Sequence, residues 1–149
     1  MPIYTTEQWL PRPLDEIFPF FADARNLGLL TPPWLRFTVK TKGAIKMREG
    51  ALIDYRIRFR GLPLWWRTRI LEWNPPNRFR DDQVWGPFRR WVHTHSFERR
   101  EGGTVCRDEV DYAVWGGTIP DRLFVRPDVE RIFRFRQEAL SKRFPVLVG

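Results

Sequence analysis

The residues best suited to chemistry are the two histidines of the chain, His93 and His95, which stand two positions apart in an alternating segment. Residues two apart on a β-strand point to the same face, so both imidazoles share a face with Trp91 and Phe97. The neighbouring segments show the same alternation, with polar and apolar residues that share one face. In the preceding segment these residues are Phe79, Asp81, Gln83 and Trp85, and in the following segment they are Cys106, Asp108, Val110 and Tyr112. A histidine oriented by an aspartate can position a polar ligand or act as a general acid or base.

The turns between these segments decide which side chains meet. A hairpin that closes around Gly86 to Arg90 predicts three facing pairs, namely Gln83 with His93, Asp81 with His95 and Phe79 with Phe97. The turn at Gly102-Gly103 then places Asp108 beside either His93 or His95.

Two earlier segments add Tyr55 and Trp66 to the same inner face. A few polar groups among aromatic walls are typical of a ligand pocket. The candidate ligand-binding residues are Tyr55, Trp66, Asp81, Gln83, Trp91, His93, His95, Asp108 and Tyr112. If the chain is an enzyme, the candidate acid–base residues are His93, His95, Asp81 and Asp108. Two other interpretations stay open: a buried network that only holds the strands in register, or a one-residue phase error that turns the whole set outward.

Other kinds of site have weaker support. No G-x-S-x-G elbow is present, and the single cysteine, Cys106, has no feature that would activate it as a nucleophile. Three well-placed metal ligands are not evident, so we expect neither a metal site nor a cofactor.

The charge balance raises a second class of function. The chain has 26 basic and 18 acidic residues, a net charge of +8, which favours an anionic partner such as RNA. Arg56, Arg58 and Arg60 alternate with Tyr55 on one segment, and the next segment adds Arg67 and Arg69 with Trp65 and Trp73 between them. Exposed arginines and aromatic rings together can hold single-stranded nucleic acid. Because acidic residues interrupt this face, a nucleic-acid partner is the less favoured hypothesis.

Periodicity predicts the elements that must position these residues. Residues 3–10 are predicted as a strand, 14–26 and 27–30 as short helices, and 51–59, 65–73, 78–85, 90–98 and 104–114 as strands. The segment from Trp115 to Pro127, with two glycines and several apolar side chains, is predicted as an irregular lid over a cavity mouth. A final helix then begins at Pro127-Asp128, with Asp128 as its N-cap, and ends at Pro145.

Size and composition favour one domain over residues 1–149, with 42% hydrophobic residues and 15% aromatic residues. No apolar run is long enough to span a bilayer, and the first residues lack the pattern of a signal peptide. With one cysteine, the expected location is the reducing cytoplasm. The oligomeric state is left open.

The order of elements resembles the helix-grip fold of the START/Bet v 1-like superfamily, also called SRPBCC or polyketide cyclase/dehydrase-like proteins. The resemblance covers nearly the whole chain and rests on the segments FFADARNLGLLTPPWLRF, GALIDYRIRFRGLPLWWRTRILEW and QVWGPFRRWVHTHSFERREGGTVCRDEVDY. It implies an α+β fold, in which a curved antiparallel sheet of about seven strands surrounds a long C-terminal helix, with two short helices after the first strand.

The resemblance also implies a cavity between the sheet and the last helix. We therefore expect a small hydrophobic or aromatic ligand there, and a non-catalytic binding protein. The alternatives are a cyclase or dehydratase that uses a His–Asp pair, and an RNA- or ribosome-associated domain that uses the arginine face.

Overall fold

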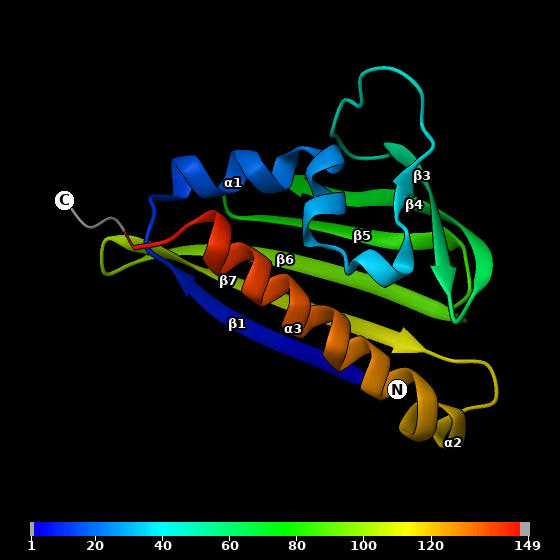
Figure 1. The fold of residues 1–149 in the computed structure, drawn as a ribbon. Coiled ribbons are helices and arrows are strands. Elements are labelled where there is room, and N and C mark those ends of the chain that lie inside the picture. The colour runs from blue at the N-terminus through cyan, green and yellow to red at the C-terminus, as the bar shows by residue number, and fades with distance from the viewer. Residues whose placement is uncertain (1, 147–149) are drawn as a thin grey trace.

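Seven strands form one antiparallel sheet, ordered β1-β7-β6-β5-β4-β3-β2, in the computed structural model, which describes residues 2–146. The strands are β1 (Ile3–Leu10), β2 (Thr38–Val39), β3 (Leu52–Phe59), β4 (Leu62–Asn74), β5 (Arg78–Trp85), β6 (Arg90–Arg100) and β7 (Gly103–Ala113). The long helix α3 (Arg126–Arg143) packs along β1, and α1 (Leu14–Ala22) packs on β6 and β7 (Figure 1). This arrangement confirms the predicted α+β helix-grip fold.

Alternation of side chains explains the strands and their inner face. Tyr55 on β3 pairs with Trp66 on β4, so both point inward as predicted. Arg60 and Gly61 make the tight turn between these strands with φ of 51° and 82°. Two-residue hairpin turns need positive φ at both positions, which glycine supplies without strain.

One bulge changes the phase of β4 (Leu62–Asn74). The register shifts between Ile70 and Glu72, so Leu71 is an extra residue that no partner on β5 opposes. Trp73 therefore points inward and packs against Phe18 and Phe79. Its predicted place beside the outer arginines is wrong.

The β5–β6 hairpin has a different register from the predicted one. Asp81 faces His93 and Phe79 faces His95 across the two strands. The turn is centred one residue earlier than expected, which shifts every facing pair by two and leaves the inward phase intact. The three predicted pairs are therefore wrong, although the predicted face is right.

The first helical region divides into shorter pieces. Helix α1 begins at Leu14 as predicted but ends at Ala22, and Asp23 follows it in an extended conformation. The carboxylate of Asp23 accepts a hydrogen bond from the backbone N–H of Arg25 at 3.0 Å. It thereby starts the 3-10 segment η1 (Ala24–Leu30), which a second such segment, η2 (Pro33–Leu35), follows.

The C-terminal helical path begins earlier than predicted. The short α2 (Thr118–Pro120), one π turn η3 (Asp121–Val125) and α3 follow one another without a break. Pro127 lies in the first turn of α3, where proline is tolerated although it lacks a backbone N–H. The predicted irregular stretch is thus largely helical, and Asp128 lies inside the first turn of α3 rather than at its N-cap.

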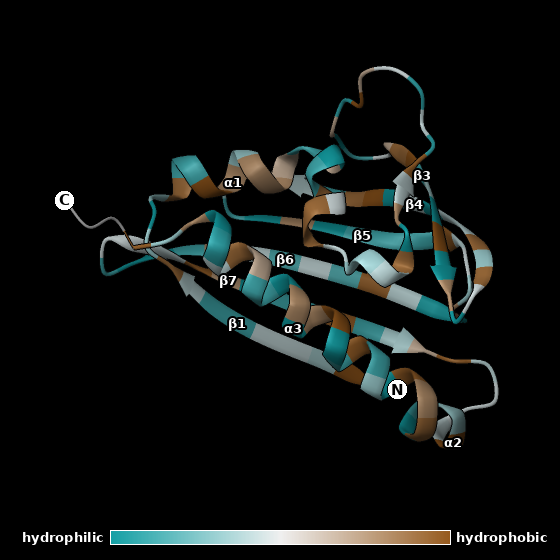
Figure 2. Ribbon diagram, viewed as in Figure 1, coloured by the Kyte–Doolittle hydropathy of each residue, from teal (hydrophilic) through white to brown (hydrophobic). Residues whose placement is uncertain are grey.

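Helix α3 buries the stripe that its sequence predicts. Val129, Phe133 and Leu140 are buried against the sheet, while the ribbon alternates hydrophilic and hydrophobic bands along its length (Figure 2). Arg136 occupies the same stripe with only 5% of its surface exposed. The buried arginine is the one residue of this stripe that packing alone does not explain.

Candidate functional site

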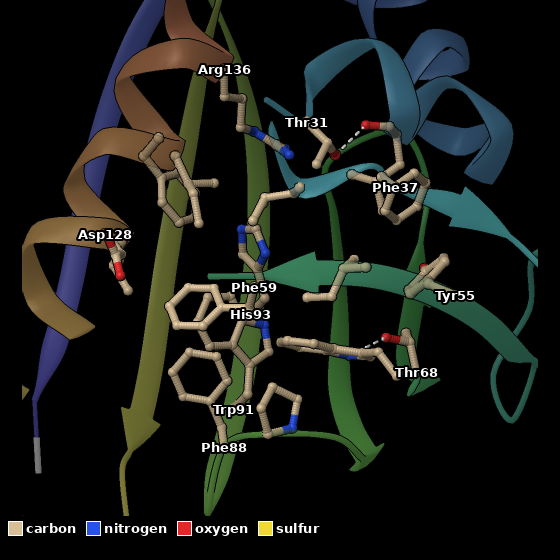
Figure 3. Close-up of a pocket in the computed structure, with 18 of the residues that line it drawn as sticks. Thr31, Phe37, Tyr55, Phe59, Thr68, Phe88, Trp91, His93, Asp128 and Arg136 are labelled. Carbon is tan, nitrogen blue, oxygen red and sulfur yellow. Dashed lines mark hydrogen bonds between the residues drawn. The ribbon is translucent and has the colours of Figure 1, made fainter. Parts of the chain in front are cut away.

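A cavity of about 340 Å³ lies between the inner face of the sheet, the η1–η2 segment and α3 (Figure 3). Its walls are mostly aromatic and aliphatic. They comprise Leu27, Leu30, Thr31, Leu35, Phe37, Tyr55, Ile57, Phe59, Trp66, Thr68, Asp81, Pro87, Phe88, Trp91, His93, His95, Val114, Trp115, Val125, Asp128, Val129, Ile132, Phe133 and Arg136. Four of the polar groups, Asp81, His93, His95 and Arg136, gather where β5 and β6 face α3.

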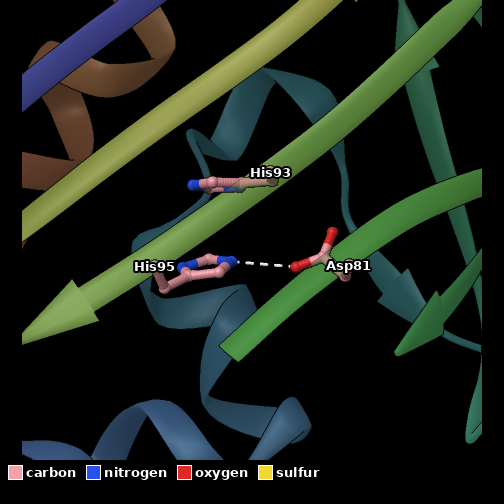
Figure 4. Close-up of side chains that lie close together, drawn as sticks. All are labelled: Asp81, His93 and His95. Atoms are coloured by element: carbon pink, nitrogen blue, oxygen red, sulfur yellow. Dashed lines mark hydrogen bonds and ion pairs between the residues drawn. The ribbon is translucent and has the colours of Figure 1, made fainter. Parts of the chain in front are cut away.

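The two histidines stack on one another at this polar end. Their ring centroids are 3.7 Å apart, and the other face of His95 stacks on Phe79 at 4.1 Å. Nε2 of His95 lies 2.8 Å from Oδ2 of Asp81 (Figure 4). His95 therefore has little freedom to rotate.

Asp108 on β7 contacts both histidines. Its Oδ1 lies 2.8 Å from Nε2 of His93, 3.4 Å from Nδ1 of His95 and 3.3 Å from Nη2 of Arg136. The guanidinium of Arg136 also lies over the rings of Phe21 and Phe133. Sheet and helix thus contribute opposite charges to one buried cluster.

Burial and pairing give the cluster distinct protonation states. Burial and the neighbouring His95 lower the pKa of His93 to about 4, so His93 is neutral at pH 7. Burial also lowers the pKa of His95, but its hydrogen bonds to Asp108 and Asp81 outweigh burial and raise the pKa overall. Burial alone would raise the pKa of Asp108. Arg136 and the two histidines outweigh burial and hold the pKa of Asp108 well below its usual range.

Three groups of this cluster could in principle ligate a metal ion. Atoms of Asp81, His93 and His95 all lie within 4.8 Å of one another, which the sequence did not reveal. The stacked imidazoles, tilted by only 25°, direct their in-plane lone pairs almost side by side rather than toward one point. The guanidinium of Arg136 adds a positive charge next to His95. Without a change of rotamer, the arrangement suits a metal ion poorly.

An ion pair crosses one edge of the cavity. Nη2 of Arg60, at the β3–β4 turn, lies 3.0 Å from Oδ2 of Asp128 on α3. The guanidinium also lies 5.8 Å from the ring centre of Phe59 and 5.6 Å from that of Phe124. We call these four residues the clasp, because they join the sheet to the helix beside the cavity.

The structure brings most of the predicted site residues together. The inward phase of the histidines and aspartates is confirmed, and six predicted residues line the cavity: Tyr55, Trp66, Asp81, Trp91, His93 and His95. Asp108 is buried behind the histidines and does not line it.

Two predicted residues lie elsewhere. The side chain of Gln83 hydrogen-bonds the backbone N–H and C=O of Phe88, so it holds the β5–β6 turn rather than facing the cavity. Tyr112 is fully buried in the core near β1 and α3, with its hydroxyl 3.4 Å from Nη1 of Arg126. Both predictions of cavity lining are wrong.

Sequence reasoning missed Arg136, although a signal was present. An arginine between Phe133 and Leu140, at the spacing of a buried helical stripe, has no solvent to face. A charged residue in that position must find a partner inside. Here the partner is Asp108.

The outer arginine face is largely neutralised by neighbouring carboxylates. Arg67 pairs with Asp54 at 2.7 Å, Arg69 pairs with Asp82 at 2.8 Å, and Arg60 belongs to the clasp. Within residues 2–146, only Arg56 and Arg58 of the five predicted arginines form no ion pair.

Comparisons with known proteins relate the chain to a family. Residues 10–141 match a family model described as polyketide cyclase / dehydrase and lipid transport. No curated protein matches the chain. Among the helices of residues 2–146, none has both the length and the apolar character that crossing a membrane requires.

Solved structures of low sequence identity share the fold. Protein CV1439 from Chromobacterium violaceum is 17% identical, with a TM-score of 0.73, and the match covers 97% of this chain and 98% of that one. Ara h 8.0201 is 14% identical, with a TM-score of 0.68 and coverage of 96% and 97%. The major latex-like protein 151 of Panax ginseng is 8% identical, with a TM-score of 0.67 and coverage of 97% of each chain.

Proposed function

Because the chain belongs to the polyketide cyclase / dehydrase and lipid transport family, we propose that it binds a small aromatic or hydrophobic molecule in the cavity between the sheet and α3. One observation carries the proposal: an aromatic cavity of about 340 Å³ ends on a buried charged cluster. That volume lies within the range of small-molecule sites. The apolar walls and the charged cluster would contribute to ligand binding in different ways.

The apolar walls would supply most of the affinity. Phe88 packs against both Trp66 and Trp91, with ring centres 5.7 Å and 4.6 Å away, so three large rings form one continuous surface. Removing a ligand ring from water against such a surface is favourable by roughly 25 cal/mol per Å² of apolar area. The cluster around His93 and Arg136 would set the direction in which the ligand lies.

A test follows from the alternation of β3. Ile57 lines the cavity, and its neighbour Arg58 points to the outer face. Ile57→Trp should fill part of the cavity, whereas Arg58→Trp adds the same side chain outside it. Native mass spectrometry of protein purified from its own host should show a small-molecule adduct on the wild type and on Arg58→Trp, and none on Ile57→Trp. An adduct retained by Ile57→Trp, or absent from all three proteins, would contradict cavity binding.

A second candidate function is proton transfer, as in a cyclase or dehydratase. The observation that favours it is the geometry of His93, whose Nε2 lies 2.8 Å from Oδ1 of Asp108 and whose ring lines the cavity. Such a pair can remove a proton from an acidic C–H or O–H group. This function requires the same cavity and adds a chemical step to binding.

A two-ring ketone with an acidic C–H, 2-tetralone, tests the second candidate. The protein in D₂O should exchange the α-hydrogens of 2-tetralone faster than buffer does, as followed by NMR. His93→Phe should abolish the acceleration. Thr94→Val is the matched control, since Thr94 contacts Arg80 and does not line the cavity. Equal exchange in the wild type and in His93→Phe would remove His93 as the base.

A further inference from the structure

Two polar atoms at the inner end of the cavity form no hydrogen bond, and one of them, Nε of Arg136, is fully buried. Among residues 2–146, no hydrogen bond is found at Nδ1 of His93 or at Nε of Arg136. Both side chains line the cavity, and both are more than nine-tenths buried. A buried polar atom is seldom left unpaired in folded proteins, so Nε of Arg136 indicates that the cavity receives a hydrogen-bond acceptor, while Nδ1 of His93 faces a ligand with its own hydrogen-bonding capacity.

The neighbour of His93 decides which of its nitrogens carries the proton. The Asp108 carboxylate, 2.8 Å from Nε2, can only accept a hydrogen bond. A neutral His93 therefore carries its proton on Nε2. Nδ1 keeps a free lone pair and is a hydrogen-bond acceptor without a donor.

The surroundings of His93 offer no other donor for this lone pair. One face of the ring stacks on His95, while Phe133 and Trp91 stand nearly perpendicular to it, at 5.6 Å and 6.4 Å. Within residues 2–146, no hydrogen bond from these neighbours to Nδ1 is found, although Trp91 carries an indole N–H. A donor must come from a molecule inside the cavity.

The charges near His93 restrict the chemistry of that donor. A carboxylate would bring a second lone pair against Nδ1, so it would be repelled. An ammonium group could donate, but the Asp108 carboxylate is already paired with the Arg136 guanidinium at 3.3 Å, and that guanidinium disfavours another cation. A neutral hydroxyl satisfies both limits, and its oxygen can accept from Arg136. A hydroxyl on an unsaturated carbon is a stronger donor than a saturated alcohol.

We propose that the ligand of this cavity is an aromatic molecule with a phenolic or enolic hydroxyl, which donates its hydrogen bond to Nδ1 of His93 and turns its oxygen toward Arg136. This inference rests on the proposed function and adds the ligand's polar group and its orientation. No covalent step is required.

The test compares two probes that differ only in the hydroxyl proton, 2-naphthol and 2-methoxynaphthalene. Isothermal titration calorimetry gives both Kd values for the wild type and for His93→Phe. The Kd of 2-methoxynaphthalene divided by the Kd of 2-naphthol should be roughly tenfold larger for the wild type than for His93→Phe, because only the wild type offers the acceptor. Comparing ratios cancels the different cost of taking the two probes out of water.

Further arms keep the result interpretable if His93→Phe folds poorly. His93→Gln retains an amide oxygen as acceptor and should restore part of the preference, and near-ultraviolet circular dichroism checks the packing of both variants. An equal ratio in the wild type and the variants would overturn the hydroxyl proposal while leaving cavity binding in place. A wild-type protein that binds neither probe would overturn both proposals.

Discussion

His93 makes the stability of this protein depend on pH in a narrow window. Its pKa is about 4 in the folded protein, whereas an unfolded histidine has a pKa near 6.5. Between these values the unfolded chain binds a proton that the folded chain excludes, so the free energy of unfolding falls as the pH falls. The difference of about 2.5 pKa units corresponds to a total loss of about 3 kcal/mol.

The shifted pKa values of His95 and Asp108 act mainly outside this window. The raised pKa of His95 adds stability that is complete below pH 6.5 and is lost as the pH rises through its folded value. The lowered pKa of Asp108 adds stability above pH 3.8 that is lost only at lower pH. The chain has no third histidine. The loss between pH 6.5 and about 5, above the titration of the carboxylates, therefore reports His93.

Urea unfolding followed by tryptophan fluorescence measures the effect. From pH 6.5 to pH 5, the wild type should lose about 1.5 kcal/mol of unfolding free energy, the part of the linkage that this interval covers. His93→Gln, which cannot titrate, should lose much less. A wild-type stability that stays constant over this interval, or an equal loss in the variant, would refute the burial of a neutral His93.

Three further substitutions have defined outcomes. Arg136→Met leaves the Asp108 carboxylate buried without its guanidinium and should cost about 3 kcal/mol in urea unfolding; a loss below about 1 kcal/mol would show that this charge is solvated. Arg60→Ala opens the clasp, so stopped-flow dissociation of 2-naphthol should be severalfold faster while stability changes by at most about 1 kcal/mol; an unchanged rate would mean that ligands leave elsewhere. Changing Arg56 and Arg58 to Ser should leave 2-naphthol affinity unaltered, and RNA binding should be weak at physiological salt; tight RNA binding that the double change abolishes would favour the outer face as the functional surface.

Alternation was sufficient to predict the strands and their inner face. Apolar and polar residues alternate from Ile53 to Phe59, and a strand buried on one face requires that pattern. Glycine and proline residues at the turns then separated β3 from β4 and β5 from β6. Parity alone therefore placed His93 and His95 toward the cavity.

Register and local irregularities were beyond single-sequence reasoning. A shift of two residues between β5 and β6 preserves parity, so nothing in the alternation distinguishes Asp81 facing His93 from Asp81 facing His95. The bulge at Leu71 reverses the phase of Trp73 without any glycine to mark it. Both features depend on how neighbouring strands pair, which only the folded chain determines.

Only the β-strand members of the charged cluster were predicted from the sequence. Its β-strand members share one parity, so they were found as a set. Arg136 comes from a helix far along the chain, and its approach to Asp108 depends on how α3 lies across the sheet. Arg136 stands out as a charged residue in the buried stripe of α3. That signal was sufficient to identify it as a candidate site residue.

The most direct test of ligand binding in the cavity uses the indole N–H signals of the tryptophans in a ¹⁵N NMR titration with 2-naphthol. Trp66 and Trp91 line the cavity, whereas Trp65, the neighbour of Trp66, is 45% exposed on the outer face and Trp9 is 44% exposed. We predict saturable shifts for Trp66 and Trp91 and none for Trp65 and Trp9. Saturable shifts confined to Trp65 and Trp9, or no saturable shift at Trp66 and Trp91, would contradict binding inside the cavity.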